Sequence, residues 1–422
     1  MNNPRIDQPV DARPARETSF NITRYAWLVV ALLWPVALLN YLDRQMLGTM
    51  KVSVMHDIPG IGLEQHWGVL LGAFKWVYAG LSPVGGYIAD RFSRRRLIVG
   101  SLFIWSVVTW ATGHVTTYEQ LLTARALMGI SEAFYIPAAL ALITDLHSGN
   151  TRSRAVGIHQ MGIYAGVLVG GFTGYVADAP NLGWRFAFGV CGLIGALYAV
   201  PLFFLLKDPQ RAPGNISRPE GTSPQRALRD LLTNGSFILL VLYFTLPALA
   251  GWVVRDWMPA ILQKRFSISQ GHAGVSATLY WLVAALLCAV LGGWLADRWM
   301  RRTNRGRIYV SAIGMACIVP AMFGVGNAGS LTVAVCFLVL FGIGWGFFDC
   351  NNMPILCQIV RPDLRATGYG LMNFVSISCG GFADWGFGAL QDRHLPLNII
   401  FSIFAMTAVV SIFLVFRIRP RI

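Results

Sequence analysis

Ionisable side chains stand well inside apolar runs of this sequence, where charge is costly. The stretch "PVALLNYLDRQMLGTM" places Asp43 and Arg44 side by side. Seven more such residues lie in other apolar runs: Lys75, Arg125, Glu132, Arg255, Asp256, Asp349 and Asp384. Each costs about 2.5–3.5 kcal/mol on membrane-insertion scales, so nine facing lipid would cost on the order of 20–30 kcal/mol. We therefore expect these side chains to face one another or water, in a polar cavity.

Two groups among them have the spacing that places side chains on one face of a helix. Arg125 and Glu132 are seven residues apart, which is two turns. Asn40, Asp43 and Arg44 lie at i, i+3 and i+4. Such a carboxylate can couple the uptake of a proton to the binding of an anion. When an anion neutralises the arginine, the carboxylate loses its cationic partner and takes up a proton. The alternative for each pair is a static salt bridge between helices.

The apolar runs that must position these residues are long enough to cross a bilayer. Of the 422 residues, 55% are hydrophobic and 13% are charged, whereas a soluble domain carries about 25% charged residues. We predict an all-α membrane protein with twelve transmembrane helices in two six-helix bundles. The spans are expected at 25–52, 67–89, 97–115, 118–146, 153–178, 184–206, 236–263, 272–296, 308–326, 331–359, 367–390 and 396–416.

The net charge of +14 is explained by membrane topology and does not indicate a nucleic-acid partner. Most of the 34 Lys and Arg fall in segments on one side of the predicted spans. The opposite side holds only Lys51, Arg185, Lys264, Arg265 and Arg393. By the positive-inside rule, the chain is predicted to be a multi-pass protein of the inner (plasma) membrane with both termini in the cytoplasm.

A sequence repeat divides the chain into two similar halves. "GYIADRFSRRR" follows the second span and "GGWLADRWMRR" follows the eighth, and both fit G-x-x-x-D-R-x-x-R-R. We predict an N-terminal bundle at 1–206, a cytoplasmic linker at 207–235, in which "SPQRALRDLL" forms a short amphipathic helix, and a C-terminal bundle at 236–422. The repeated loops are predicted to act as cytoplasmic gates that hold one conformation, through Asp90, Arg91, Arg94, Asp297, Arg298 and Arg301.

Three further sites leave alternatives open. Arg255 and Asp256 are either part of the central site or a static pair near the outer end of their span. Asp349, Asn352 and Pro354 predict a polar break in the tenth span, which either kinks the helix or contributes to a gate or binding site. Lys75 has no acid on its own helix and either binds an anion or extends toward the interface.

The paired loops, the six-plus-six pattern and the central linker resemble the major facilitator superfamily over essentially the whole chain. "LNYLDRQ", "GAFKWVYAGLSPVGGYIADRF" and "ARALMGISEAF" resemble its anion:cation symporter family, which implies proton-coupled symport of a small organic anion such as a hexuronate or aldonate. The resemblance implies that Asp43 and Glu132 couple protons. It implies substrate contacts at Tyr41, Tyr78 and Asn373, and it makes Arg44 and Arg125 the partners of these carboxylates or anchors for the anion. Lys75 departs from the family, which more often has a small residue there; as an extra cation it is predicted to bind a more acidic substrate. The same motifs also resemble Spinster-type lysolipid transporters, the alternative function.

Other classes of protein find little support in the sequence. No nucleophile–histidine–acid set, phosphate-binding loop or metal-ligand spacing occurs, so no enzyme, no metal and no cofactor other than a coupling proton is expected. The expected partners are a small anionic substrate and the lipid bilayer, with no nucleic acid, and the chain is expected to act as a monomer.

Overall fold

The structure is a computed structural model that describes residues 13–147, 151–208 and 224–420. The first half contains α1 (Arg13–Thr49), α2 (Lys51–Asp57), α3 (Glu64–Arg91), α4 (Arg94–Thr112), α5 (Tyr118–Glu132), α6 (Tyr135–Leu146), α7 (Arg152–Asp178) and α8 (Gly183–Leu205). The second half contains α10 (Gly235–Phe266), α11 (Gln270–Met300), α12 (Gly306–Asn327), α13 (Leu331–Ile359), α14 (Arg365–Asp392) and α15 (Leu397–Arg417). Short 3₁₀ turns lie at Pro59–Ile61 and Pro362–Leu364, and the predicted linker helix is α9 (Pro224–Leu232).

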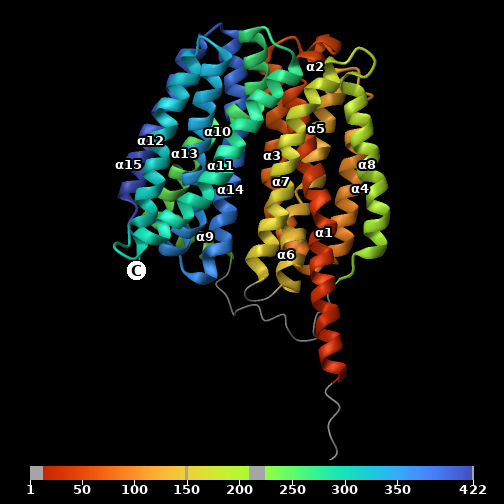
Figure 1. Ribbon diagram of the computed structural model, residues 1–422, viewed down its shortest axis with the longest axis vertical. Helices are drawn as coiled ribbons and strands as arrows, with labels where there is room; N and C mark the ends of the chain where they lie inside the picture. Colours follow the sequence, from red (N-terminus) through yellow and green to blue (C-terminus); the bar gives the residue numbers. More distant parts are fainter. Residues whose placement is uncertain (1–12, 148–150, 209–223, 421–422) are drawn as a thin grey trace, which may run out of the picture.

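The helices form two bundles that stand side by side, which confirms the predicted all-α fold (Figure 1). Within the described residues, nine segments are long and apolar enough to cross a membrane by themselves. The three other predicted spans correspond to α3, α4 and α14, which are helices of 28, 19 and 28 residues in the same bundles.

The outer surface of the bundles is apolar, and the polar side chains lie inside. Val290 on α11 is 77% exposed, and Phe204 on α8 and Phe413 on α15 also point outward. Asp43, Lys75, Arg125, Glu132 and Asp384 are instead buried. This arrangement is the reverse of that of a soluble protein and is the one that hydrocarbon around the bundles favours.

Two spans differ from the prediction in where they break. The predicted polar break in the tenth span is wrong, because α13 is one continuous helix through Pro354. Asn351 donates a side-chain hydrogen bond to the Phe347 carbonyl at 3.0 Å and so bonds within the helix. The fourth span is broken instead, directly after Glu132, where α5 ends and α6 begins three residues later. There the Ala133 carbonyl lies against Gly85 of α3, where a Cβ atom would be 2.6 Å from that oxygen.

The two bundles touch at one end of the molecule, which we call the far side because the start of α1, the end of α15 and the linker helix α9 lie at the other end, the termini side (Figure 1). Asp392, at the end of α14, accepts hydrogen bonds from the backbone N–H groups of Glu64 and Gln65 at 2.9 and 2.8 Å. Asp178, at the end of α7, accepts one from the N–H of Gly271 at 2.8 Å. Each carboxylate therefore caps the first turn of a helix in the other bundle.

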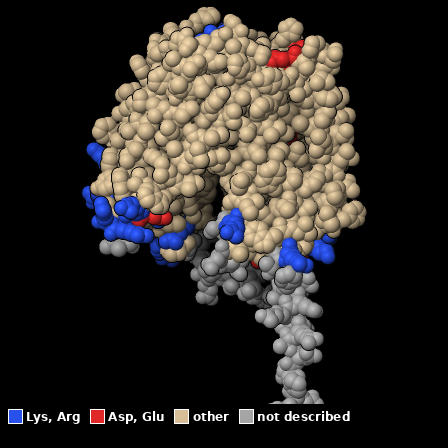
Figure 2. Space-filling model, in the orientation of Figure 1, with Lys and Arg blue, Asp and Glu red and all other residues tan. Residues whose placement is uncertain are grey.

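These two caps are equivalent under the sequence duplication. Helices α7 and α14 are the fifth spans of their halves, and α3 and α11 are the second spans. Glycines allow the same helices to approach closely: the backbone of α14 at Asp384 lies against Gly68, and Thr278 of α11 lies against Gly171. On the termini side the surface is hollowed between the bundles (Figure 2). The structure is thus closed on the far side and open on the termini side.

Candidate functional site

The predicted pair on the first and fourth spans does meet in the N-terminal bundle, at the helix break. Arg44 Nε donates to Glu132 Oε2 at 2.6 Å, and both side chains are almost fully buried. The Arg44 guanidinium also lies over three aromatic rings, with its carbon 4.7 Å from the centres of Tyr41 and Tyr78 and 4.8 Å from that of Phe74. These cation–π contacts place both predicted substrate tyrosines against the arginine.

Arg125 lies beside this pair and has spare hydrogen-bonding capacity. Its guanidinium is 4.7 Å from the centre of Phe74, and its Nη1 donates to the sulfur of Met128 at 3.2 Å. Its buried Nε has no hydrogen-bond partner in the structure. A buried cation with an unused donor is unfavourable on its own, so this arrangement suits a group that binds an anion in part of its working cycle.

Asp43 does not pair with its neighbour Arg44. Its Oδ2 accepts a hydrogen bond from Thr109 of α4 at 2.9 Å, and its Oδ1 is buried without a partner. Adjacent residues point about 100° apart on a helix, so Arg44 reaches α5 while Asp43 reaches α4. The two side chains therefore contact different helices, while the Asp43 carboxylate stays within electrostatic range of Glu132, Arg125 and Arg44.

A second charged group joins the two bundles and was not predicted as a unit. Lys75 of α3 contacts Asp256 of α10 at 2.5 Å and Asp384 of α14, and all three side chains are buried. Trp257 donates from Nε1 to the other oxygen of Asp384 at 3.2 Å, and the Lys75 ammonium lies 4.2 Å from the centre of the Trp252 ring. We call Lys75, Asp256 and Asp384 the ionic triad.

The ionic triad changes the interpretation of Lys75. Its ammonium does not extend toward the interface, and in this conformation it is bound to two carboxylates rather than free for a substrate. The acids were missed because they are 181 and 309 residues away in the sequence. Asp384 was recognised as an ionisable residue inside a span, but nothing in its local sequence indicated this partner.

A cavity of about 240 Å³ lies between the bundles. Its walls come from α1, α7, α10, α11 and α13 and include Tyr41, Tyr164, Trp252, Arg255, Trp281, Phe341, Trp345 and Asp349. The Arg255 guanidinium carbon lies 5.1 Å from the centre of the Tyr41 ring, whose other contact is Arg44. The Tyr41 ring therefore contacts one arginine from each bundle, Arg44 from the N-terminal bundle and Arg255 from the C-terminal bundle. We call this space the central cavity.

The remaining predicted site residues lie in different places. Arg255 and Asp349 line the central cavity, and the Arg255 Nε is 4.0 Å from Asp256. Asn352 is buried within α13, and Asn373 on α14 is half-buried and does not line the central cavity. Within the described part of the chain, no cluster of His, Cys, Asp and Glu has the make-up to hold a metal ion.

The predicted gating residues pair inside their own bundles. Arg94 donates to the Ala141 carbonyl at 2.9 Å and pairs with Asp145, both on α6. Asp297 lies 3.7 Å from Arg307 of α12. Arg298 lies over the Trp294 ring on its own helix, and Arg301 is exposed. The side chains of Asp90 and Arg91 lie outside the described part of the structure.

Two bundles closed at one end, with buried charges at their junction and a cavity between them, define a membrane transporter that works by alternating access. The family model of the Major Facilitator Superfamily matches residues 33–383, and the chain belongs to this superfamily. It is 30% identical to protein spinster homolog 1 of Bos taurus over 93% of this chain and 78% of the relative. It is 26% identical to the sphingosine-1-phosphate transporter SPNS2 of Xenopus tropicalis, over 85% and 72%.

A solved structure agrees with this fold. A bacterial homologue of the human lysosomal transporter Spinster, in an inward-facing and occupied conformation, matches with a TM-score of 0.78 and 20% identity, over 93% of this chain and 96% of that chain. Of the two resemblances drawn from the sequence, the comparisons therefore support the Spinster type. Its relatives are transporters and not enzymes.

Proposed function

We propose that the chain is a proton-coupled transporter of an anionic amphiphile of the lysolipid class. The observation that carries this proposal is the wall of the central cavity, where Arg255 stands among Trp252, Trp281, Phe341 and Trp345. The lining holds one cation, Arg255, and one acid, Asp349. An arginine in an aromatic wall suits a ligand with an acidic head and an apolar chain. The relative SPNS2, a sphingosine-1-phosphate transporter, supports the same substrate class.

The proposed location is the inner membrane, with both termini in the cytoplasm. Lys and Arg gather on the termini side of the surface in Figure 2, which is the cytoplasmic side by the positive-inside rule. The closed far side then faces outward, and the structure represents an inward-open state. Because one chain supplies both bundles, it works as a monomer.

Proton coupling is proposed to begin at Tyr41. An anion entering the central cavity binds Arg255 and displaces the ring of Tyr41, which also covers Arg44. Arg44 or Arg125 then turns to the anion, and Glu132 loses its ion pair at 2.6 Å. A buried carboxylate without a cation is strongly disfavoured, so Glu132 takes up a proton.

The ionic triad provides the far-side step of the proposed cycle. Two carboxylates and one ammonium leave one excess negative charge within the ionic triad, and Arg255 Nε lies 4.0 Å from Asp256. Opening the far side separates Lys75 from α10 and α14, which is costly unless a proton neutralises a carboxylate. Protonation therefore favours opening, and the proton and the anion move together.

Symport of a sugar acid is the second candidate. The observation that favours it is the buried group of Arg44, Arg125 and Glu132, which contains two cations and one acid. A compact anion bound there would satisfy the unpartnered Nε of Arg125.

Uptake into liposomes separates the two candidates. The purified chain, with a pH gradient imposed, is offered a radiolabelled lysophosphatidic acid or a radiolabelled hexuronate. We expect the lysolipid to accumulate, and Arg255→Ala to raise its KM about 10–100-fold, as loss of a charged contact predicts. Arg229→Ala, on the linker helix α9, is the control. Accumulation of the hexuronate alone would contradict the proposal and support the second candidate.

A further inference from the structure

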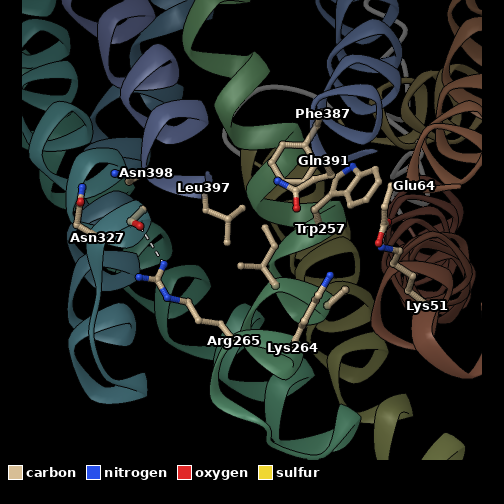
Figure 3. A pocket seen from close by; sticks show the side chains of 13 residues that line it. Lys51, Glu64, Trp257, Lys264, Arg265, Asn327, Phe387, Gln391, Leu397 and Asn398 are labelled. Carbon is tan, nitrogen blue, oxygen red and sulfur yellow. Dashed lines mark hydrogen bonds and ion pairs between the residues drawn. The ribbon is translucent and has the colours of Figure 1, made fainter. Parts of the chain in front are cut away.

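A second and larger cavity opens at the far side, away from the central cavity. Its volume is about 500 Å³, within the range of small-molecule sites. It is formed mainly by the C-terminal bundle, by the ends of α10, α12 and α14 and the start of α15, and the N-terminal bundle contributes Lys51 and Glu64. Figure 3 shows these side chains around it. We call it the far cavity.

The ionic triad separates the two cavities. Along α10, Trp252 and Arg255 line the central cavity, Asp256 belongs to the ionic triad, and Trp257 to Arg265 contribute to the far cavity. The far cavity is therefore a space of its own while the far side is closed.

Cations outnumber acids in this cavity. Its lining contains Lys51, Lys264 and Arg265 and one acid, Glu64. Lys51 pairs with Glu64, and Arg265 donates to the carbonyls of Val325 and Gly326 at 3.3 and 2.9 Å, which are neutral acceptors. Lys264 extends into the cavity, and among the described residues it forms no ion pair with an acid (Figure 3). The far cavity thus has two cations more than its acid neutralises.

The electrostatics of Lys51 reflect this excess. Lys51 begins α2, beyond the first span, which ends at Thr49. Burial lowers the pKa of Lys51 despite the nearby Glu64 carboxylate, and the positive charge of Lys264 lowers it further. An anion in the far cavity would oppose both effects.

The floor of the far cavity is apolar and aromatic. Trp257 and Phe387 are almost fully buried, with ring centres 4.8 Å apart, and Ile261 and Leu397 complete the wall. Lys51 lies 4.5 Å above the centre of the Trp257 ring. Charged groups thus lie beside an apolar floor, which is the pattern that an amphiphile requires.

We propose that the far cavity is a second binding site, which takes an anionic amphiphile with its acidic head at Lys264 and Arg265 and its apolar part on Trp257 and Phe387. Because Lys51 and Glu64 belong to the other bundle, the occupant contacts both bundles. Bundle separation on the far side would dismantle the site. The ligand therefore stabilises the far-side-closed state and slows turnover, whichever substrate the central cavity carries.

Trp257 links the far cavity to the ionic triad. Its ring forms the floor of the far cavity, and its Nε1 donates to Asp384 at 3.2 Å. A ligand packed on this ring holds the indole in place, and with it the hydrogen bond to a member of the ionic triad. The structure thus contains a direct route from far-cavity occupancy to closure of the junction.

The test measures the distance between the bundles on the far side. Spin labels are placed at His56 on α2 and His272 on α11, both exposed, after replacement of the seven cysteines. The full chain is reconstituted in phosphatidylcholine nanodiscs and titrated with a lysophosphatidic acid. We expect a shift toward the short distance, and Lys264→Ala to weaken the apparent affinity about tenfold, as loss of one charged contact predicts.

Two control variants make the outcome specific. Arg393→Ala removes an exposed far-side cation that does not line the cavity, and it should leave the titration unchanged. Arg255→Ala disables the central cavity, and the distance shift should persist in it, so that failure of the proposed transport function does not affect the result. A shift that is lost in Arg255→Ala but kept in Lys264→Ala would overturn the proposal.

A second set of nanodiscs tests whether the ligand is a lipid of the bilayer or a diffusible amphiphile. Nanodiscs that contain phosphatidylglycerol, without added lysolipid, test a bilayer lipid as the occupant. A shift in this arm assigns the site to the bilayer, and a shift only with lysophosphatidic acid assigns it to a diffusible amphiphile. No shift in either arm refutes the site.

Discussion

Replacing Lys75 by methionine removes the one cation of the ionic triad with little change of volume. Asp384 then lies in the closed far side without a positive partner, and Asp256 keeps only Arg255, whose Nε is 4.0 Å away. Lys75 is 5% exposed and Asp384 is fully buried, so the general value for removal of one partner of a buried ion pair applies, about 3–5 kcal/mol. The two acids come from α10 and α14 and the lysine from α3, so this cost falls on the far-side-closed state.

The expected result is a shift of the conformational equilibrium. A cost of about 3–5 kcal/mol corresponds to a factor of roughly 10² to 10³ or more toward the far-side-open state. The His56–His272 spin-label distance should lengthen. The effect should be largest at alkaline pH and diminish at acidic pH, because protonation removes the charge of the unpaired carboxylates.

The matched control is the double variant Lys75→Met with Asp384→Asn. It leaves one carboxylate, and so restores the net charge of −1 that the ionic triad has in the native chain. We expect it to recover much of the closed population. If Lys75→Met alone keeps the native distance distribution at every pH, the ionic triad does not stabilise the closed state, and the proposed far-side step is wrong.

Three further changes test other parts of the structure. Glu132→Gln should abolish pH-driven accumulation in liposomes while counterflow exchange persists; accumulation at the native level would exclude its coupling role. Asp178→Ala and Asp392→Ala each remove one carboxylate cap at a cost of about 0.5–2 kcal/mol, so together they should lengthen the far-side distance more than either alone. Equal distances in all variants would mean that the two caps do not hold the far side closed. Gly68→Ala places a methyl group against α14 and should lower the melting temperature of the closed state, whereas Gly80→Ala, with open space around it, should leave it equal or slightly higher. If Gly68→Ala melts at the same temperature as the native chain, the close approach of α14 to Gly68 does not stabilise the closed state.

Much of the fold was predictable because the bilayer imposes a simple rule. Long apolar runs must become helices that cross the membrane, since no other conformation satisfies the backbone there. The repeated loop identified the duplication, and the price of buried charge predicted that Arg44, Arg125 and Glu132 gather in the interior. All three do so around Phe74 and the helix break.

The helix breaks show where local sequence misleads. Pro354 and its polar neighbours suggested an interruption, yet the surrounding helices and the Asn351 side chain keep α13 continuous. The interruption after Glu132 follows from Pro137, four residues after Ala133, because proline has no N–H to donate to the Ala133 carbonyl and its ring crowds that oxygen. Gly85, which belongs to another helix, leaves room for this carbonyl.

The sequence by itself determined the helical spans, the two equivalent halves, the asymmetry of positive charge and the presence of charges that cannot face lipid. Each of these follows from residues close together in the chain and from the solvent around them. Only the tertiary structure decided which charges meet. Lys75 finds Asp256 and Asp384, and Asp178 and Asp392 cap α11 and α3, because packing of the two bundles brings together residues that no local pattern relates.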